Sequence, residues 1–421
     1  MISGCDTARL LVLCLHSPQL GGRNDKTDDR KAPGHLMTIA RISALLLAIL
    51  LLAGCGGPRA VLWLGPSSDI MVDTAAKPAA VVPIYIATSR QRSDNLSLPY
   101  NAKRSPTLNF ARVDVGIPPN HKNGLVEKTG YKPNPAKYFA AVAFQPYDNS
   151  KVFTEKLNAA LAARPADEQE ILIFVHGYNN NFADSTFREA QFIHDYGFKS
   201  VAVHYAWPSG GSLGLYAYDR DSANFARDGL AKLLEIVSRT KAKRILLVGH
   251  SMGTLVVMEA LRTLAISGKR TPLDRLTGVM LAAPDIDVDV FKEQVKDIGK
   301  LPRPFAVLVS REDKALNISG RITGGHPRVG DGSSIQMLRD NGIAVLDLSA
   351  VDGGSHDVFA SSPTLMTLVR RGGLTERTLE GEGPTPGEAI LADGSSVIQG
   401  AASLVLYLPA RILTAATDLP R

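Results

Sequence analysis

The chain has 421 residues, of which 45% are apolar and 21% are charged. This balance is typical of a globular protein and excludes a disordered chain, a collagen-like chain and a polytopic membrane protein. The 47 Lys and Arg residues exceed the 41 Asp and Glu residues by six. Because no long basic run concentrates that excess, we expect no nucleic-acid partner.

All cysteines of the chain lie in its first 55 residues, at Cys5, Cys14 and Cys55. The remainder therefore has no disulfide framework and no cysteine-based zinc site. We expect a secretory signal peptide at 37–54, because Met37 and Arg41 precede an apolar run at 44–53 that is too short to span a membrane. Residues 1–36 are then an upstream extension that is not part of the fold.

The expected signal peptide is followed directly by Cys55, and the sequence Leu52-Ala53-Gly54-Cys55 resembles the lipobox of bacterial lipoproteins. The resemblance implies that Cys55 is acylated and becomes the new N-terminus. Residue 56 is glycine rather than the aspartate that favours inner-membrane retention, so the outer membrane is favoured. We expect a lipid-anchored protein of the bacterial cell envelope that faces the periplasm, with residues 55–80 as a tether. The alternatives are a cleaved signal with an incidental cysteine, or an uncleaved anchor.

From residue 81 onward, strand patterns alternate with helix patterns. Strands are expected at 81–87, 138–144, 171–175, 200–205, 244–248, 276–282, 304–309 and 343–348. Helices are expected at 153–163, 182–196, 222–239, 252–266 and 288–298, and a polar stretch without an assigned element covers 88–135. This alternation predicts an α/β domain at 81–371 with a mostly parallel central sheet and helices on both faces. A C-terminal tail follows at 372–421, and its apolar stretch 401–416 is interpreted as a docked helix or a surface amphipath.

A serine motif, Gly249-His250-Ser251-Met252-Gly253, lies between one of these strands and the next helix. Glycines permit a sharp strand-to-helix turn, because they bring no Cβ against the neighbouring backbone. Such a turn lifts the Ser251 hydroxyl above the carboxyl edge of the sheet. It also leaves the Met252 amide at a helix N-terminus, where it can bind an oxyanion. The alternative is a glycine-rich cap on an ordinary helix.

With its surroundings, this motif resembles the α/β-hydrolase superfamily, and more narrowly a bacterial esterase- and lipase-like branch formerly catalogued as a domain of unknown function. The resemblance runs from about residue 81 to 370. It is carried, besides the serine motif, by His176-Gly177-Tyr178-Asn179-Asn180, Trp207-Pro208-Ser209, Ala283-Pro284-Asp285, Ser310-Arg311-Glu312-Asp313 and Gly354-Ser355-His356. It implies that the backbone amide of Tyr178 is the second oxyanion donor, while the His176 side chain braces the loop.

A nucleophilic serine needs a histidine base, and that base needs an acid to fix its tautomer. In this superfamily the chain order is serine, acid, histidine, which leaves His326 and His356 as possible bases. His356 follows the last expected strand in a glycine-rich loop and is preferred. Asp313, which follows the strand at 304–309, is the preferred acid. The further candidates are Asp285, in second place, and then Asp287 and Glu312.

These residues predict a serine hydrolase that cleaves a small-molecule or lipid carboxylic ester through an acyl-serine intermediate. The alternatives are acyl transfer or thioester or amide cleavage by the same triad, and a non-catalytic envelope lipoprotein that uses the fold for binding. The segment 207–211, with Tyr216 and Tyr218 beyond it, either lines an acyl pocket or is a turn with a packed tryptophan. Asp219 and Asp221 suit the N-terminal dipole of the next helix. No residue spacing points to a metal or a cofactor.

Overall fold

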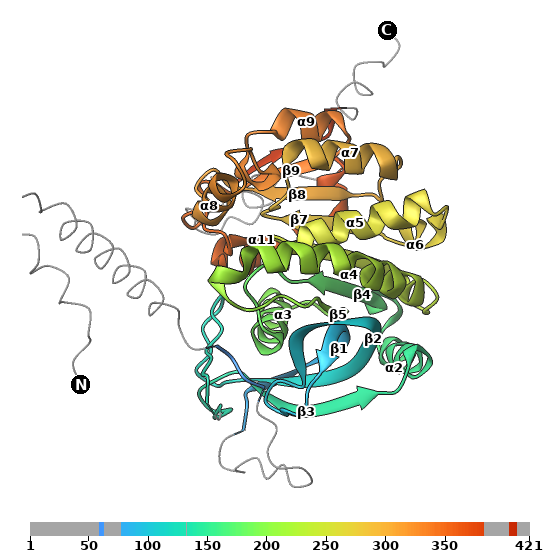
Figure 1. The fold of residues 1–421 in the computed structure, drawn as a ribbon, viewed down its shortest axis with the longest axis vertical. Helices are drawn as coiled ribbons and strands as arrows, with labels where there is room; N and C mark the ends of the chain where they lie inside the picture. Colours follow the sequence, from blue (N-terminus) through green and yellow to red (C-terminus); the bar gives the residue numbers. More distant parts are fainter. Residues whose placement is uncertain (1–58, 63–76, 132, 383–403, 411–421) are drawn as a thin grey trace, which may run out of the picture. The chain divides into compact units, whose positions relative to one another are not determined.

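A ten-stranded sheet runs through the described part of the chain, in the order β10-β9-β8-β7-β6-β4-β5-β1-β2-β3 (Figure 1). The structure is a computed structural model, and it describes residues 59–62, 77–131, 133–382 and 404–410. Each neighbouring pair from β9 to β1 is parallel, whereas β10, β2 and β3 pair antiparallel. The chain therefore has an α/β fold with a mostly parallel central sheet, as the sequence predicts.

The central parallel strands are short and apolar, because helices cover both of their faces. They are β4 (Glu170–Val175), β5 (Val201–Ala206), β6 (Arg244–His250), β7 (Gly278–Ala282), β8 (Phe305–Val309) and β9 (Ala344–Asp347). Alternate residues of β4 enter different cores: Ile171, Ile173 and Val175 face one side, and Leu172 and Phe174 face the other. All six strands agree with the sequence expectation to within a few residues.

The helices form a layer on each face of the sheet (Figure 1). One core includes residues of α2 (Ser150–Ala162), α4 (Tyr216–Val237), α5 (Gly253–Ile266), α6 (Arg270–Asp274), α7 (Val288–Ile298) and α9 (Ile335–Asp340). The other includes residues of α3 (Phe182–Tyr196), α10 (Val358–Ser361), α11 (Pro363–Arg370) and α12 (Glu376–Leu379). Helix α4 begins six residues before the expected start at 222. The short helices α6, α8 (Lys314–Ile322) and α9 to α12 were not predicted.

Three strands from the N-terminal part of the domain extend the sheet beyond β5. They are β1 (Ala80–Arg92), β2 (Tyr100–Ile117) and β3 (Ala140–Tyr147). The sequence showed only a polar stretch over 88–135 and did not predict β2, because pairing with β1 and β3 makes a strand of this largely polar, half-exposed segment. Its second half shows the alternation that marks it, with Ala111, Val113 and Val115 buried.

Parts of the predicted tether and tail pack onto the domain instead. Ala60 and Leu62 are fully buried, and Leu62 forms backbone hydrogen bonds with Ser97 (2.9 Å) and Ala141 (3.2 Å). Residues 59–62 are therefore not a free tether. In the tail, β10 (Val405–Tyr407) pairs with β9, so the expectation of a helix is wrong there: a new edge strand satisfies the hydrogen-bonding groups of β9. The expected signal peptide and Cys55 lie outside the described residues.

Candidate active site

Ser251 occupies a sharp turn between β6 and α5. Its φ of 52° lies in the left-handed region, which costs a non-glycine residue roughly 1–3 kcal/mol and persists only where the surroundings enforce it. One enforcing contact is the hydrogen bond from the Ser251 amide to the carbonyl of Ala282 at the end of β7, 2.9 Å long. A strained serine at a strand-to-helix turn is the geometry that the serine motif predicts.

Two glycines let this turn approach the end of β4. A Cβ on Gly253 would stand 2.2 Å from the carbonyl oxygen of His176, and a Cβ on Gly177 would stand 2.9 Å from the Cβ of Ser251. The loop that carries Tyr178 therefore lies directly against the serine turn. Met252 stands at the N-terminus of α5, where the first amides have no partner within the helix. The two predicted oxyanion donors thus belong to segments in direct contact.

The segment 177–181, here called the oxyanion loop, is held in place by a hydrogen bond to a buried carboxylate. Asp219, in the first turn of α4, accepts hydrogen bonds from the amides of Asn179 (3.2 Å) and Gly210 (2.6 Å) and from the hydroxyl of Ser209 (2.6 Å). The pKa of Asp219 is raised overall, because burial raises it by more than these hydrogen bonds lower it. Because its partners lie in two loops, Asp219 joins the oxyanion loop to the segment 207–211, here called the tryptophan loop.

A buried cation joins the same two loops. Arg90, at the end of β1, donates to the carbonyl of Asn180 (2.8 Å) and to that of Ser209 (3.1 Å). Burial lowers its pKa to about 10, whereas the charge of Asp219 acts in the opposite direction. Because both side chains are fully buried, solvent does not screen their charges. We therefore assign Arg90 and Asp219 to holding the oxyanion loop in place.

His176 has the bracing position that the sequence suggested. Its ring nitrogens lie 2.9 Å from the carbonyl of Gly177 and 3.1 Å from that of Trp207, and its ring stacks on the indole at 5.0 Å and 9°. Burial lowers the pKa of His176 well below its usual value. Trp207 is fully buried, so it packs beneath the loop rather than lining an open acyl pocket.

The loops after β8 and β9 bring Asp313 and His356 together. Nδ1 of His356 lies 2.6 Å from Oδ2 of Asp313, whose side chain is 1% exposed. Burial lowers the pKa of His356, but the hydrogen bond to Asp313 and the negative charges of Asp313, Asp357 and Asp285 raise it above its usual value overall. With Nδ1 held by the carboxylate, Nε2 is the nitrogen that remains for a proton transfer.

The other carboxylate oxygen of Asp313, Oδ1, caps the N-terminus of a helix. This oxygen accepts the amides of Ala315 (2.9 Å) and Leu316 (3.0 Å) at the start of α8. An N-cap of this kind orients the side chain and stabilises the helix. The helix therefore fixes the direction in which Oδ2 meets the imidazole.

His250, the residue before Ser251, ties His356 to the serine turn. Its Nε2 donates to the carbonyl of His356 at 3.2 Å, and the two rings lie 4.8 Å apart. Burial, together with the positive charge of His356, lowers the pKa of His250 to about 4. His250 is therefore neutral near pH 7. Its ring also packs on Phe359 at 4.4 Å.

The other acid and base candidates have different partners. Asp285 accepts from the hydroxyls of Tyr216 (3.0 Å) and Ser319 (2.5 Å) and pairs with the buried Arg328 at 3.4 Å. His326 is 65% exposed in its side chain and stands 3.9 Å from Asp287.

The remaining acid candidate, Glu312, is exposed. Tyr218, which was considered for the acyl pocket, donates to the carbonyl of Ala102 in the N-terminal extension. The imidazole and carboxylate that the structure joins at the carboxyl edge of the sheet are those of His356 and Asp313.

Sequence reasoning missed three polar residues that support the oxyanion loop. These are Arg90, Asp219 and Arg59, the last of which donates to the carbonyl of Asn179 at 2.7 Å. Asp219 was interpreted only as a charge suited to a helix dipole. The positive φ of Asn179 (61°) shows that this loop needs external support. The sequence carries no local signal for Arg59 or Arg90, because both reach the loop from distant segments.

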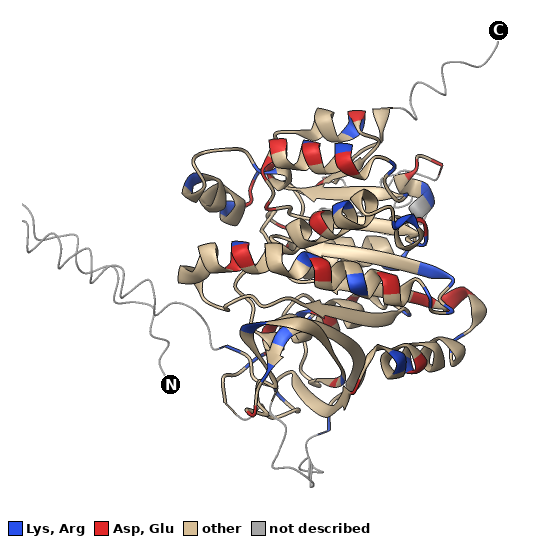
Figure 2. Ribbon diagram, turned by 45° about the vertical axis from the view of Figure 1, so that its right-hand side comes forward, with Lys and Arg blue, Asp and Glu red and all other residues tan. Residues whose placement is uncertain are grey.

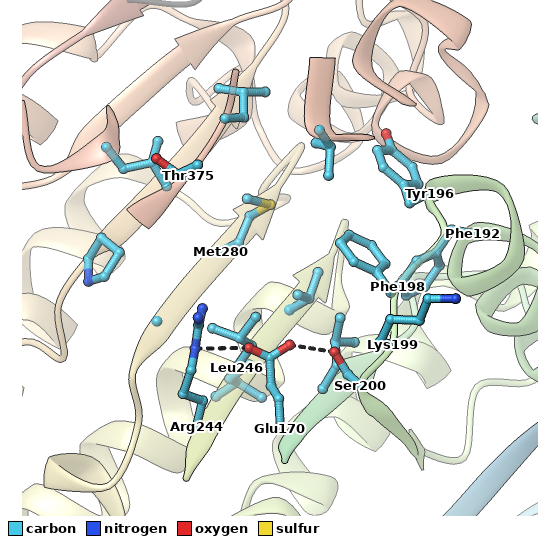
Figure 3. Close-up of a pocket in the computed structure, with 18 of the residues that line it drawn as sticks. Glu170, Phe192, Tyr196, Phe198, Lys199, Ser200, Arg244, Leu246, Met280 and Thr375 are labelled. Atoms are coloured by element: carbon cyan, nitrogen blue, oxygen red, sulfur yellow. Dashed lines mark hydrogen bonds and ion pairs between the residues drawn. The ribbon is translucent and has the colours of Figure 1, made fainter. Parts of the chain in front are cut away.

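A separate cavity of about 750 Å³ opens near the opposite ends of the strands (Figure 3). Its wall includes the first residues of β4 and β6, Glu170 and Arg244, which form an ion pair of 3.1 Å. Ser251 does not line this cavity.

The surface helices carry acidic and basic residues interspersed (Figure 2). Among the described residues there is no metal-binding cluster of His, Cys, Asp and Glu and no helix long and apolar enough to cross a membrane.

Comparison with known proteins places this geometry among α/β hydrolases. The model of a family described as alpha/beta hydrolase of unknown function (DUF900) matches residues 149–372, more than half of the chain. Among solved structures, lipase B of Aspergillus fumigatus is similar at 12% sequence identity over 49% of this chain, with a TM-score of 0.32. The match covers 52% of the lipase, so the chain spans about half the length of that protein. No curated protein matches the chain.

Proposed function

The chain belongs to the alpha/beta hydrolase family of unknown function whose model matches it, and from this premise we propose that it is a serine hydrolase that cleaves carboxylic esters. The observation that carries the proposal is the contact of 2.6 Å between His356 Nδ1 and the buried carboxylate of Asp313. Further support is the contact between the carbonyl of His356 and Nε2 of His250, which is the residue before the strained Ser251.

In the proposed mechanism the Ser251 hydroxyl attacks the acyl carbon while His356 Nε2 takes its proton. The negative charge that develops on the acyl oxygen is bound by the amides of Tyr178 and Met252. His356 then returns the proton to the departing alkoxide, and the alcohol leaves. A water molecule repeats the sequence on the acyl-serine, so that the carboxylic acid is released and Ser251 is restored.

Asp313 acts on the base rather than on the substrate. Its Oδ2 holds the imidazole with the proton on Nδ1, which leaves Nε2 free to accept, and it stabilises the imidazolium that forms. Arg90 and Asp219 hold the oxyanion loop before substrate arrives, so little reorganisation is needed when the charge develops.

Hydrolysis of short p-nitrophenyl esters tests the proposal. Ser251→Ala and His356→Ala are expected to lose nearly all turnover while retaining the wild-type circular dichroism spectrum, because each removes an atom that exchanges the proton. His326→Ala is the matched control, since its side chain is exposed and outside the Asp313 contact. Full activity of a folded Ser251→Ala protein would overturn the mechanism, and loss of activity only in His326→Ala would transfer the base role.

We also propose that the enzyme works at a membrane, anchored through an acylated Cys55. The support is the sequence alone: a basic start, a short apolar run and Leu52-Ala53-Gly54-Cys55 at its end. One acyl chain holds a protein only marginally, whereas the several chains of a bacterial lipoprotein hold it firmly. The substrate of such an enzyme is an ester in or near the cell envelope.

A further inference from the structure

Exposed aliphatic side chains gather on two neighbouring elements at the rim of the candidate active site. One element is the short 3₁₀ helix Leu213–Leu215 after the tryptophan loop, and the other is α8. The exposed fractions are 69% for Leu213, 42% for Leu215, 57% for Ile318 and 63% for Ile322. Single exposed aliphatics are ordinary, but a group of them on adjoining elements marks a binding surface. We call these four side chains the rim patch.

Hydrogen bonds join the two elements of the rim patch. The hydroxyl of Tyr216, which follows Leu215, lies 2.8 Å from that of Ser319, which follows Ile318. Each hydroxyl has one proton and donates it to Asp285, so this carboxylate bridges the two elements. The two elements that carry the exposed aliphatics are therefore held together by polar groups beneath the surface.

The rim patch adjoins the proposed catalytic groups on two sides. The hydroxyl of Tyr178 donates to the carbonyls of Ser212 (3.2 Å) and Leu213, so the 3₁₀ helix rests on the oxyanion loop. On the other side, Asp313 is the N-cap of α8. A surface that pressed against the rim patch would therefore lie next to the segments that carry the proposed oxyanion donor and the proposed acid.

The charge on α8 indicates what kind of surface this is. The helix carries two cations, Lys314 and Arg321, and no acidic residue between Lys314 and Ile322. Both cations are exposed, while Leu316 on the same helix is buried against the domain. Exposed aliphatics flanked by cations are typical of helices that lie in the interface of an anionic bilayer. Figure 1 shows α8 at the outer margin of the domain.

We propose that the rim patch docks on an anionic lipid surface and turns the active-site entrance toward it. Ile318, Ile322, Leu213 and Leu215 insert among the acyl chains, and Lys314 and Arg321 contact the anionic head groups. Docking thus delivers a lipid ester to Ser251 without its full transfer through water. The delivery of a lipid ester rests on the proposed ester hydrolysis, whereas the docking rests on the exposed aliphatics and the cations of α8.

Vesicle co-sedimentation tests the docking on a chain that begins at Gly56, which avoids any lipid anchor and keeps the compact unit Pro58–Arg421 whole. Vesicles of phosphatidylglycerol and phosphatidylcholine are compared with vesicles of phosphatidylcholine alone. The variant Ile318→Ser/Ile322→Ser is expected to bind anionic vesicles at least about tenfold more weakly than the wild type. The matched control is Ile266→Ser, because Ile266 is 64% exposed at the far end of α5.

The cations are tested in the same assay. Lys314→Gln/Arg321→Gln is expected to weaken binding to anionic vesicles and to reduce its salt dependence, whereas Lys292→Gln/Lys296→Gln on α7 leaves both unchanged. Size-exclusion chromatography and p-nitrophenyl acetate hydrolysis without vesicles accompany each variant. Both are expected to stay at wild-type values, because the soluble ester needs no docking.

Three results would overturn the docking proposal. They are equal binding of the wild type and Ile318→Ser/Ile322→Ser, wild-type binding that does not respond to anionic lipid, and a wild-type dimer that Ile322→Ser dissociates, which would make the patch an interface between copies. Absence of any p-nitrophenyl acetate hydrolysis by the wild type contradicts the proposed function instead. Vesicle binding that depends on the patch would stand even then, so the two failures are distinguishable.

Discussion

Replacement of Asp313 by asparagine separates the catalytic role of this side chain from its structural role. The asparagine oxygen can take the place of Oδ1 and keep the amides of Ala315 and Leu316 at the start of α8. Its amide nitrogen then stands where Oδ2 lay, 2.6 Å from His356 Nδ1. Because an amide donates, it stabilises the tautomer with a bare Nδ1 and a protonated Nε2. That tautomer cannot accept the serine proton.

The magnitude follows from the same two contacts. Loss of the correct tautomer in a serine triad lowers kcat by about 10⁴, which corresponds to about 5 kcal/mol of transition-state stabilisation. Since the helix cap survives, the free energy of unfolding is expected to change by less than about 1 kcal/mol. Asp313→Ala loses the cap as well, so it is expected to cost about 1 kcal/mol more in stability at a similar loss of kcat.

Steady-state kinetics with p-nitrophenyl acetate across pH 5–9, beside urea unfolding curves, measure both quantities. His356 must be neutral to take a proton, and its pKa is raised, so wild-type kcat/KM is expected to fall as the pH drops through a value above 6.5. Without the carboxylate, the effect of burial remains and the pKa falls. The residual activity of Asp313→Asn is therefore expected to extend to lower pH.

Asp285→Asn is the matched control for this experiment. Its carboxylate bonds Tyr216 and Ser319 and pairs with the buried Arg328. Its loss is therefore expected to lower stability more than Asp313→Asn does, because Arg328 is left without a counter-charge. Turnover per folded molecule should fall far less. Equal and small activity losses in the two variants would refute the assignment of Asp313, and a larger loss in Asp285→Asn would assign the role to Asp285.

Three further predictions concern the surroundings of the site. Gly253→Ala is expected to lose most activity and to lower the free energy of unfolding by several kcal/mol, because the new Cβ would lie 2.2 Å from a backbone oxygen of His176. Unfolding curves and activity assays check this prediction, and wild-type stability and activity would contradict the close approach. Asp219→Asn is expected to lower kcat about tenfold or more with little change in KM and to weaken binding of a boronic acid inhibitor, whereas Asp221→Asn, exposed on the same helix, changes neither. Expression from Met37 is expected to give a membrane-bound protein with lipid mass on Cys55, and Cys55→Ser a protein without it; wild-type protein free in the periplasm without lipid would end that proposal.

The central strands and the serine turn could be predicted because their determinants are local. Continuous apolar runs such as 171–175 belong to strands buried on both faces, and the glycines around Ser251 mark the turn directly in the sequence. Asp313 and His356 were proposed from their places after β8 and β9, and the structure puts their side chains in contact. Chain order restricts such pairs, since the carboxyl ends of parallel strands meet at one edge.

The elements that were missed depend on partners far away in the chain. The polar first half of β2 resembles a loop until β1 pairs with it, and β10 becomes a strand only beside β9. Asp219 has the local signature of an acidic residue near a helix N-terminus, but the fold buries it between two loops. Tertiary pairing overrides local propensity in each of these cases.

Covalent labelling of the nucleophile tests the central claim most directly. The folded wild-type chain is treated with a fluorophosphonate probe, and the modified peptide is identified by mass spectrometry. A single adduct on Ser251 is expected, formed in proportion to the loss of esterase activity, with much slower labelling in His356→Ala because the base is absent. An unlabelled wild type with intact esterase activity, or an adduct on another serine, would contradict the assignment of Ser251.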